Sequence, residues 1–252
     1  MKNRIKIDEE LYIGEEFTII AGPCAVESME QMEKIGEFLS KHNIKILRGG
    51  AFKPRTNPKS FQGLGIEGFK ILKEIKDKYH FKIISEVMDP RDIEIAHDYI
   101  DIFQIGSRNM YNYSLLKEIG KSNKPILLKR GMSATIEEWI NAAEYIEIGG
   151  NHNIIFCERG IRGFDNYTRN VLDLMSVPII KEKTNYPIIV DPSHGTGRRE
   201  LIIPAVKAAL ALEADGVMIE IHPNPKEALS DGAQSLDFEG FEKLLMEIEK
   251  IK

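Results

Sequence analysis

The chain has 252 residues, of which 42% are hydrophobic and 29% are charged, with a net charge of −5. This composition is typical of a globular protein, and the acidic balance argues against a nucleic-acid partner, which would need a basic face. Two cysteines, Cys24 and Cys157, are too few for a disulfide framework. The first residues have no apolar signal-peptide core, and no apolar run approaches the roughly 20 residues of a membrane span. We therefore expect a cytoplasmic protein without a membrane partner.

Residues 1–16 are charged and alternate only weakly between apolar and polar, which fits a short hairpin or an extended arm. Eight apolar runs follow, each of the length and composition of a buried strand. They cover residues 17–21, 44–47, 81–85, 100–105, 125–129, 153–157, 187–190 and 216–220.

Helix-like segments alternate with these runs. Ser28 with Gln31, and Thr135 with Glu138, have the spacing of a capping box, which predicts a helix start at each. The segments are 28–41, 66–79, one beginning at Asp89-Pro90, 111–120, one beginning at Thr135, 165–175, 199–213 and 237–252. Eight strands that alternate with helices predict a parallel sheet closed into a (β/α)8 barrel, an α/β fold.

The expected organisation is an N-terminal arm or hairpin over 1–16 and one barrel domain, the catalytic one, over 17–252. A doubly wound open sheet is the alternative, but its first strand is usually followed by a glycine-rich fingerprint. Here residues 21–24 are Ala-Gly-Pro-Cys, which is not that fingerprint. The sequence therefore favours the barrel.

Polar or reactive side chains follow all eight predicted strands, at the end where barrel enzymes build their active sites. The opposite ends carry mainly helix tails and turns, and this asymmetry indicates an enzyme. In chain order the side chains are Cys24; Arg48, Lys53 and Arg55; Glu86; Gln104, Ser107 and Arg108; Lys129 and Arg130; Cys157, Glu158 and Arg159; Asp191 and His194; and Glu220, His222 and Asp231.

Six of these basic side chains form a group of cations that would converge at one end of the barrel. Positive charges that lie close together repel one another unless anions lie between them. They predict a ligand set with several negative charges, such as phosphates and a carboxylate. For any one of them alone, an ordinary surface ion pair is the alternative. The six are Arg48, Lys53, Arg55, Arg108, Lys129 and Arg159.

A second group, Cys24, His194, Glu220 and Asp231, could bind a metal. A thiolate, an imidazole and two carboxylates suit a borderline divalent ion of the Mn, Fe, Zn or Co type. The four are scattered along the chain, and each also has an ordinary structural explanation as a core, turn or ion-pair residue. We interpret Cys157 as core packing, and His222, on the same strand face as Glu220, as a supporting group or substitute ligand.

These stretches together resemble one family, the 3-deoxy-D-arabino-heptulosonate 7-phosphate (DAHP) synthases, and in particular their short type I-beta form. The resemblance runs in unbroken order from about residue 17 to the end of the chain. It rests on Ala21-Gly22-Pro23-Cys24, Arg48 with Lys53-Pro54-Arg55-Thr56, Gly106-Ser107-Arg108, Leu128-Lys129-Arg130-Gly131-Met132, Cys157-Glu158-Arg159-Gly160, Asp191-Pro192-Ser193-His194, and Glu220 with Ser230-Asp231-Gly232.

The resemblance implies a transferase that joins phosphoenolpyruvate to erythrose 4-phosphate with release of phosphate, the first step of the shikimate route to aromatic amino acids. It implies one divalent metal ion in the site. It also implies a homo-oligomer, either a tetramer or a dimer.

The resemblance assigns roles by motif. The metal ligands are Cys24, His194, Glu220 and Asp231, of which Cys24 and His194 also count as catalytic. Phosphoenolpyruvate is held by Arg48, Ser107, Arg108, Lys129 and Arg159, and the aldose phosphate by Lys53, Pro54, Arg55 and Thr56. Lys129 and Glu86 lie near the reacting centre, where Lys129 acts either as an acid or through its charge alone.

Two alternatives remain. The related 3-deoxy-D-manno-octulosonate 8-phosphate synthases use arabinose 5-phosphate, and their matching loop resembles Lys-Ala-Asn-Arg-Ser-Ser rather than Lys53-Pro54-Arg55-Thr56, which favours erythrose 4-phosphate here. A non-catalytic sensor of phosphorylated metabolites is more remote, because the candidate metal set is complete. We expect no attached regulatory domain, and hence no feedback inhibition by Phe or Tyr through one.

Overall fold

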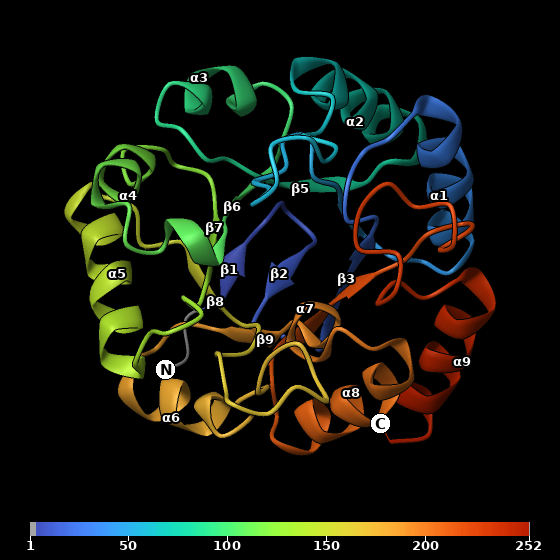
Figure 1. Cartoon of the computed structure of the whole chain (residues 1–252). Coiled ribbons are helices and arrows are strands. Elements are labelled where there is room, and N and C mark those ends of the chain that lie inside the picture. The colour runs from blue at the N-terminus through green and yellow to red at the C-terminus, as the bar shows by residue number, and fades with distance from the viewer. Residues whose placement is uncertain (1–3, 252) are drawn as a thin grey trace.

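The structure, a computed structural model, describes residues 4–251 and is a closed barrel of eight parallel strands inside a ring of helices (Figure 1). The strand order β10-β3-β4-β5-β6-β7-β8-β9 pairs the last strand with the first strand of the barrel. The predicted (β/α)8 fold and its eight strands are therefore confirmed. The strands are β3 (Thr18–Gly22), β4 (Ile46–Arg48), β5 (Lys82–Glu86), β6 (Ile102–Ile105), β7 (Ile126–Lys129), β8 (Ile154–Glu158), β9 (Ile188–Val190) and β10 (Gly216–Glu220).

The outer ring consists of α1 (Met29–Lys41), α2 (Ile66–Tyr79), α3 (Asp92–His97), α4 (Tyr113–Ile119), α5 (Ile136–Ile148), α6 (Ser176–Lys183), α8 (Ile202–Ala211) and α9 (Phe238–Glu249). Thr135 and Glu138 form a complete capping box at α5. Ser28 caps α1 as predicted, but the Gln31 side chain accepts from the N–H of Glu27 rather than from Ser28. Two short helices were not predicted: η1 (Ser107–Asn109) and α7 (Pro192–Thr196). A third, η2 (Arg199–Leu201), is the first turn of the segment predicted as helix over 199–213 and leads directly into α8.

Two helix predictions need correction. The helix expected at Asp89-Pro90 begins only at Asp92, because the Asp89 carboxylate accepts from the N–H of Arg91 and holds the chain in a turn. The helix expected over 165–175 is wrong, because the helix here is α6, which begins at Ser176. Residues 165–175 are irregular, and their backbone bonds go elsewhere: the N–H of Arg169, for example, donates to the carbonyl of Thr196 at 2.8 Å.

A small antiparallel hairpin, β1 (Ile5–Lys6) and β2 (Tyr12–Ile13), covers the amino end of the barrel. Its Ile5 and Ile13 pack with the residues inside the barrel, and the Asp8 carboxylate lies 2.8 Å from Nζ of Lys82, the first residue of β5. Figure 1 shows the hairpin within the ring of barrel strands. Residues 1–3 of the predicted arm and residue 252 of the predicted last helix lie outside the described part of the chain.

The barrel interior has an apolar layer below a polar one. The apolar layer contains Ile20, Ile46, Ile84, Ile102, Leu127, Ile155, Ile189 and Met218. Side chains along a strand alternate between the two faces, so the residue two positions later points to the same interior. At the carboxyl end those positions hold Gly22, Arg48, Glu86, Gln104, Lys129, Cys157, Asp191 and Glu220. The alternation therefore places most of the polar and charged interior side chains at the carboxyl end of the barrel and the apolar layer toward its amino end.

A second apolar core lies between the strands and the helices. Trp139 belongs to it: this residue is fully buried, and its Nε1 donates to the carbonyl of Leu128 at 3.2 Å. Cys157 is fully buried among the interior residues, which confirms its interpretation as core. Within residues 4–251, the helices are all too short or too polar to cross a membrane.

Candidate active site

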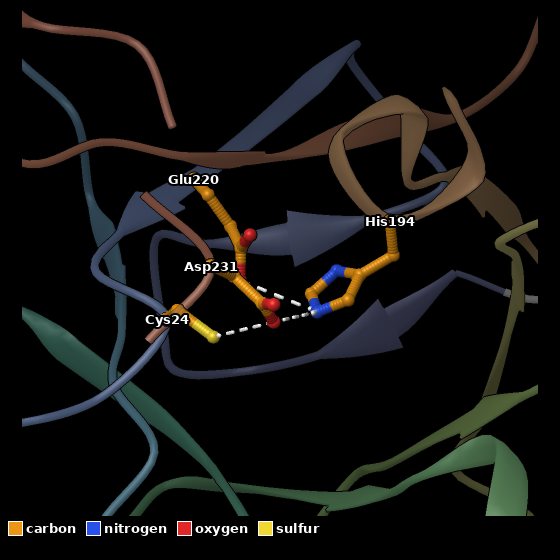
Figure 2. A group of neighbouring side chains, drawn as sticks. All are labelled: Cys24, His194, Glu220 and Asp231. Atoms are coloured by element: carbon orange, nitrogen blue, oxygen red, sulfur yellow. Dashed lines mark hydrogen bonds and ion pairs between the residues drawn. The ribbon is translucent and has the colours of Figure 1, made fainter. Parts of the chain in front are cut away.

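Cys24, His194, Glu220 and Asp231 meet at the carboxyl end of the barrel (Figure 2). One ligand atom from each lies within 4.8 Å of the others. Cys24 follows β3, Glu220 ends β10, His194 lies in α7 and Asp231 lies in the loop between β10 and α9. The structure therefore brings together all four of the metal ligands suggested by the sequence.

Local interactions place the imidazole of His194. Asp191 caps α7, with Oδ1 accepting from the N–H of His194 at 3.0 Å, and Pro192 occupies the first turn. The other carboxylate oxygen, Oδ2, lies 2.8 Å from Nδ1 of His194. Nε2 is therefore left to face Glu220 Oε1 at 3.3 Å and Asp231 Oδ2 at 4.0 Å. A carboxylate behind a histidine is the usual way to orient a metal-binding imidazole.

Burial and neighbouring charges together shift the pKa values of the cluster. Burial raises the pKa of the Cys24 thiol to about 12, and it lowers the pKa of His194. Burial also opposes ionisation of Asp231, but His194 and Arg169 outweigh it and lower the pKa of this carboxyl to about 2. The Cys24 thiol donates to Asp231 Oδ2 at 3.1 Å, and Lys53 Nζ lies 3.0 Å from the same sulfur. One sulfur, one imidazole nitrogen and two carboxylates fit a borderline divalent cation, which would displace the thiol proton.

A cavity of about 300 Å³ opens beside this cluster. Its wall contains His194 and Asp231 together with all six cations predicted from the strand ends. It also contains Arg169, which the sequence reasoning missed because this residue lies eleven positions beyond β8 (169 − 158), in the segment wrongly expected to be a helix. The predicted binding residues Pro54, Thr56 and Ser107 line the same cavity, as do Glu86 and Gln104.

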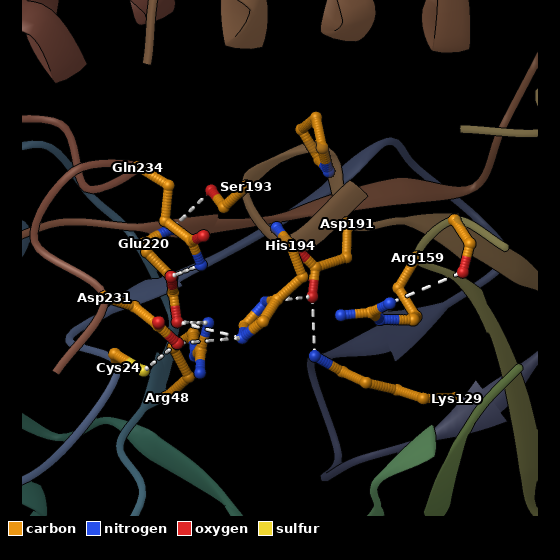
Figure 3. Close-up of polar contacts among 12 residues, drawn as sticks. Cys24, Arg48, Lys129, Arg159, Asp191, Ser193, His194, Glu220, Asp231 and Gln234 are labelled. Carbon is orange, nitrogen blue, oxygen red and sulfur yellow. Dashed lines mark hydrogen bonds and ion pairs between the residues drawn. The ribbon is translucent and has the colours of Figure 1, made fainter. Parts of the chain in front are cut away.

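The basic side chains divide into those that protein groups neutralise and those that they do not. Arg48 Nη1 lies 2.9 Å from Glu220 Oε1, and Lys129 Nζ lies 2.6 Å from Asp191 Oδ2 (Figure 3). Arg169 Nη1 lies 3.4 Å from Asp231 Oδ1. Lys53 Nζ donates to both the sulfur and the carbonyl of Cys24 at 3.0 Å.

Three arginines of the cavity wall, Arg55, Arg108 and Arg159, have no carboxylate partner among residues 4–251. Arg55 donates only to the hydroxyl of Ser230 at 2.7 Å, and Arg159 only to the carbonyl of Gly160 at 3.4 Å. Arg108 is exposed. In addition, Arg48 is buried and its Nε has no partner in the described part of the chain. The cavity therefore keeps positive charge and free donors for anionic ligands.

Glu86 lies at the cavity wall, where Gln104 Nε2 donates to its Oε2 at 3.3 Å. A side chain on Gly106 would collide with the Glu86 carboxylate, because its Cβ would stand 2.1 Å from Oε1. The glycine before Ser107 and Arg108 therefore gives Glu86 its place beside the cavity.

His222 lies outside the four-residue cluster. Its Nε2 is 3.3 Å from Glu27 Oε2, and its Nδ1 accepts from the N–H of Asn224 at 3.0 Å. Gln234, which the sequence reasoning did not name, instead contacts the cluster directly by donating to Glu220 Oε2. No sequence pattern marks Gln234, since it lies in a loop of irregular structure.

Comparison with known proteins gives a consistent result. The family model of the DAHP synthetase I family matches residues 3–252. The phospho-2-dehydro-3-deoxyheptonate aldolase of Thermotoga maritima is 53% identical over 235 residues, which cover 93% of this chain and 70% of that protein. The 2-dehydro-3-deoxyphosphooctonate aldolase of Fusobacterium nucleatum is 31% identical over 99% of this chain and 96% of its own length.

Solved structures agree. The crystal structure of the Thermotoga maritima phospho-2-dehydro-3-deoxyheptonate aldolase (DAHP synthase) superposes with a TM-score of 0.96 and 50% identity, over 99% of this chain and 73% of that one. A truncated form of 3-deoxy-D-arabino-heptulosonate 7-phosphate synthase from the same organism gives 0.92 and 47%, over 99% and 92% of the two chains. The chain therefore belongs to the DAHP synthetase I family.

Proposed function

We propose that this chain is a transferase that condenses phosphoenolpyruvate and erythrose 4-phosphate, with water, to DAHP and inorganic phosphate, the first step of the shikimate pathway. Membership of the DAHP synthetase I family supports this. The observation that carries it is one cavity in which unneutralised arginines stand next to the Cys24, His194, Glu220 and Asp231 cluster. Such a cavity suits two substrates that each carry phosphate, one of which presents a carbonyl group.

Phosphoenolpyruvate brings a carboxylate and a phosphate, and we assign both to Arg48, Arg108, Lys129 and Arg159, with Ser107 beside them. In the described part of the chain, Arg108 and Arg159 have no carboxylate to displace, and Nε of Arg48 has no partner. The Asp191 carboxylate fixes the Lys129 ammonium at 2.6 Å, so Lys129 can donate a hydrogen bond to the enol phosphate without swinging away.

The aldose phosphate belongs to the loop of Lys53, Pro54, Arg55 and Thr56. Arg55 is held by Ser230, the neighbour of Asp231, which places its guanidinium between the loop and the cluster. A divalent ion held by Cys24, His194, Glu220 and Asp231 would polarise the aldehyde oxygen as a Lewis acid. This arrangement supports a sugar phosphate with its phosphate on the loop and its aldehyde toward the cluster.

The bond changes balance without a further reactant. The methylene carbon of phosphoenolpyruvate bonds to the aldehyde carbon, and water adds to C2, which has become electron-deficient. The C–O bond from C2 to phosphate then breaks, and C2 becomes a ketone that carries the water oxygen. Of the two protons of the water, one goes to the former aldehyde oxygen and the other leaves with inorganic phosphate. Lys129 and the arginines stabilise the charges of the phosphates throughout, and Glu86, hydrogen-bonded to Gln104, offers an acceptor at the cavity wall. We propose that Glu86 orients the attacking water.

The test is to measure phosphoenolpyruvate consumption and phosphate release with erythrose 4-phosphate and, separately, with arabinose 5-phosphate, before and after chelation. We expect turnover with the four-carbon substrate, loss of activity on chelation, and recovery when Mn²⁺ or Co²⁺ is returned. A clear preference for arabinose 5-phosphate would replace this proposal with the octulosonate reaction. Tight binding of both phosphates without turnover would identify a sensor, and an undiminished rate after removal of the metal would exclude the metal-dependent reaction.

We further propose that the protein is cytoplasmic and assembles with copies of itself into a dimer or tetramer, with residues 1–16 an arm and residues 17–252 one domain. Exposed aromatic side chains at Phe164 and Tyr167 support self-association. Light scattering on the eluting protein measures the mass directly, and a monomer at micromolar concentration would contradict the proposed assembly.

A further inference from the structure

The two carboxylates of the metal cluster each turn one oxygen inward and one outward. Glu220 Oε1 faces His194 and Arg48, whereas Oε2 accepts from Nε2 of Gln234. Asp231 Oδ2 faces the Cys24 sulfur, whereas Oδ1 lies 3.4 Å from Nη1 of Arg169. Both outward oxygens are therefore already occupied by protein donors.

Those two donors are linked to each other, because Arg169 Nη1 also donates to Oε1 of Gln234 at 2.9 Å. Arginine has only donors and an ionised carboxylate has only acceptors. The amide between them must therefore turn its oxygen to Arg169 and its nitrogen to Glu220. Gln234 is 3% exposed and Glu220 is fully buried, so water cannot easily replace this bond. Figure 3 shows the Gln234 amide against Glu220, on the side away from Cys24.

The Arg169 backbone is fixed to the helix that carries the histidine ligand. Its N–H donates to the carbonyl of Thr196 at 2.8 Å, and the neighbouring Asn170 donates from its side chain to the carbonyl of His194 at 2.9 Å. A side chain on Gly197 would lie 2.6 Å from Cβ of Arg169, so the two segments pack closely. These contacts fix the position of Arg169 relative to His194 as well as to Asp231.

We propose that Arg169 and Gln234 are positioning residues for the metal site. They occupy the outward oxygens of Asp231 and Glu220, so that each carboxylate offers the cation a single oxygen and leaves room for a substrate oxygen. This inference rests on the metal of the proposed function. Without the pair, either carboxylate is free to rotate and give both oxygens to the cation, or neither.

The experiment uses the full chain loaded with Co²⁺ and no substrate. The Co²⁺ affinity is measured by competition with a chelator, and the visible absorption of Co²⁺ reports its coordination. The variants are Gln234→Met, which keeps the side-chain length but loses both hydrogen bonds, Arg169→Met, and the double variant. Arg162→Met is the matched control, because Arg162 is an exposed arginine in the same segment and is not in the cavity wall.

We expect each single variant to lower the Co²⁺ affinity about tenfold and to change the visible spectrum, as other supporting groups of metal ligands do. The Co²⁺ affinity of the double variant should fall by less than the product of the two single effects, because Arg169 and Gln234 belong to one hydrogen-bonded network. Arg169→Lys, which keeps a donor, should lose less affinity than Arg169→Met. Arg162→Met should stay within about twofold of the parent protein.

Unchanged affinity and spectrum in folded Gln234→Met and Arg169→Met would overturn the proposal. If Gln234→Met does not fold, Arg169→Met and Arg169→Lys decide alone, because the Arg169 side chain is partly exposed. A loss as large in Arg162→Met would equally overturn it. Since the assay contains no substrate, a positive result combined with absent turnover would refute the proposed reaction and leave the metal-site inference intact.

Discussion

Arg130 joins the ends of β7 and β8 and follows Lys129, which lines the cationic cavity, in the chain. Its Nη1 lies 3.0 Å from Glu158 Oε2 and 2.8 Å from Asp173 Oδ2, and its Nε donates to the carbonyl of Ala134 at 3.1 Å. Arg130 is 4% exposed and Glu158 is fully buried. Replacing Arg130 with methionine preserves much of the buried volume. Among the described residues, it leaves Glu158 ionised in the core with the N–H groups of Gly160 and Asp173 and the hydroxyl of Ser176 as its remaining donors.

Removing one partner of a buried ion pair lowers the free energy of unfolding by about 3–5 kcal/mol. The contact with Asp173 adds little to this, because that carboxylate is partly exposed. We therefore expect Arg130→Met to lower the free energy of unfolding by about 4 kcal/mol at pH 7.5. Glu158→Gln, added to Arg130→Met, should restore about half of that or more, because it removes the uncompensated charge.

The difference should also depend on pH. Burial raises the pKa of Glu158 even with Arg130 present, and removal of the arginine raises it further. When the pKa of a carboxyl group is higher in the folded than in the unfolded state, the folded protein loses stability as the pH rises toward and through the folded-state pKa. The gap between the parent protein and Arg130→Met should therefore be largest at neutral pH and shrink as the pH falls toward 5.

The effect is measured by unfolding each variant in urea and monitoring the circular dichroism and the tryptophan fluorescence. The fluorescence comes from Trp139, the chain's single tryptophan, whose ring lies 5.9 Å from the Arg130 guanidinium. Lys34→Met is the control, since it breaks the exposed pair with Glu30 and should lower stability by less than about 0.5 kcal/mol. A loss below about 1 kcal/mol for Arg130→Met, or no recovery with Glu158→Gln, would refute the reasoning.

Three further predictions concern the site. Arg55→Ala should raise KM for the aldose phosphate by about ten- to a hundredfold, and KM for phosphoenolpyruvate much less, because a charge-assisted hydrogen bond contributes about 1.5–3 kcal/mol; equal effects on both substrates in steady-state kinetics would contradict the assignment. Asp191→Asn should weaken metal affinity about ten- to a hundredfold, because His194 loses its oriented partner, and a chelator titration with unchanged affinity would count against this role. In the metal-free folded protein, Cys24 and Cys157 should both react slowly with iodoacetamide at pH 7.5, because burial raises the pKa of both thiols; mass spectrometry would disprove this if native labelling matched that in urea.

The fold followed from the sequence because buried parallel strands are continuous apolar runs. Strand ends were less certain: the run over 100–105 predicted a strand from Ile100, but Ile100 packs in the turn and β6 begins at Ile102. The helix expected over 165–175 was wrong because its backbone groups bond to α7, which is distant in the chain and invisible to local periodicity.

The candidate site could be found where it lies at strand ends, since the alternation of side chains fixes which residues meet there. Arg169 and Gln234 could not, because they lie in loops whose paths depend on tertiary contacts. His222 shows the limit of the same rule. The prediction extended the alternation of side chains from Glu220 to His222, but β10 ends at Glu220. Beyond it, Ile221 pairs with Leu236, and His222 contacts Glu27.

The pairing of β10 with β3 has a consequence for how the barrel stays closed. These are its last and first strands, and the four-residue cluster spans the line where they meet, with Cys24 on one side and Glu220 and Asp231 on the other. Cys24 and Asp231 are 207 residues apart in the chain. A crosslink that closes a loop of this length removes about 5 kcal/mol of chain entropy from the unfolded state. A cation bound by Cys24 beside β3 and by Glu220 and Asp231 beside β10 would act as such a crosslink. The same side chains that bind the cation for the reaction would then also hold the first and last strands of the barrel together.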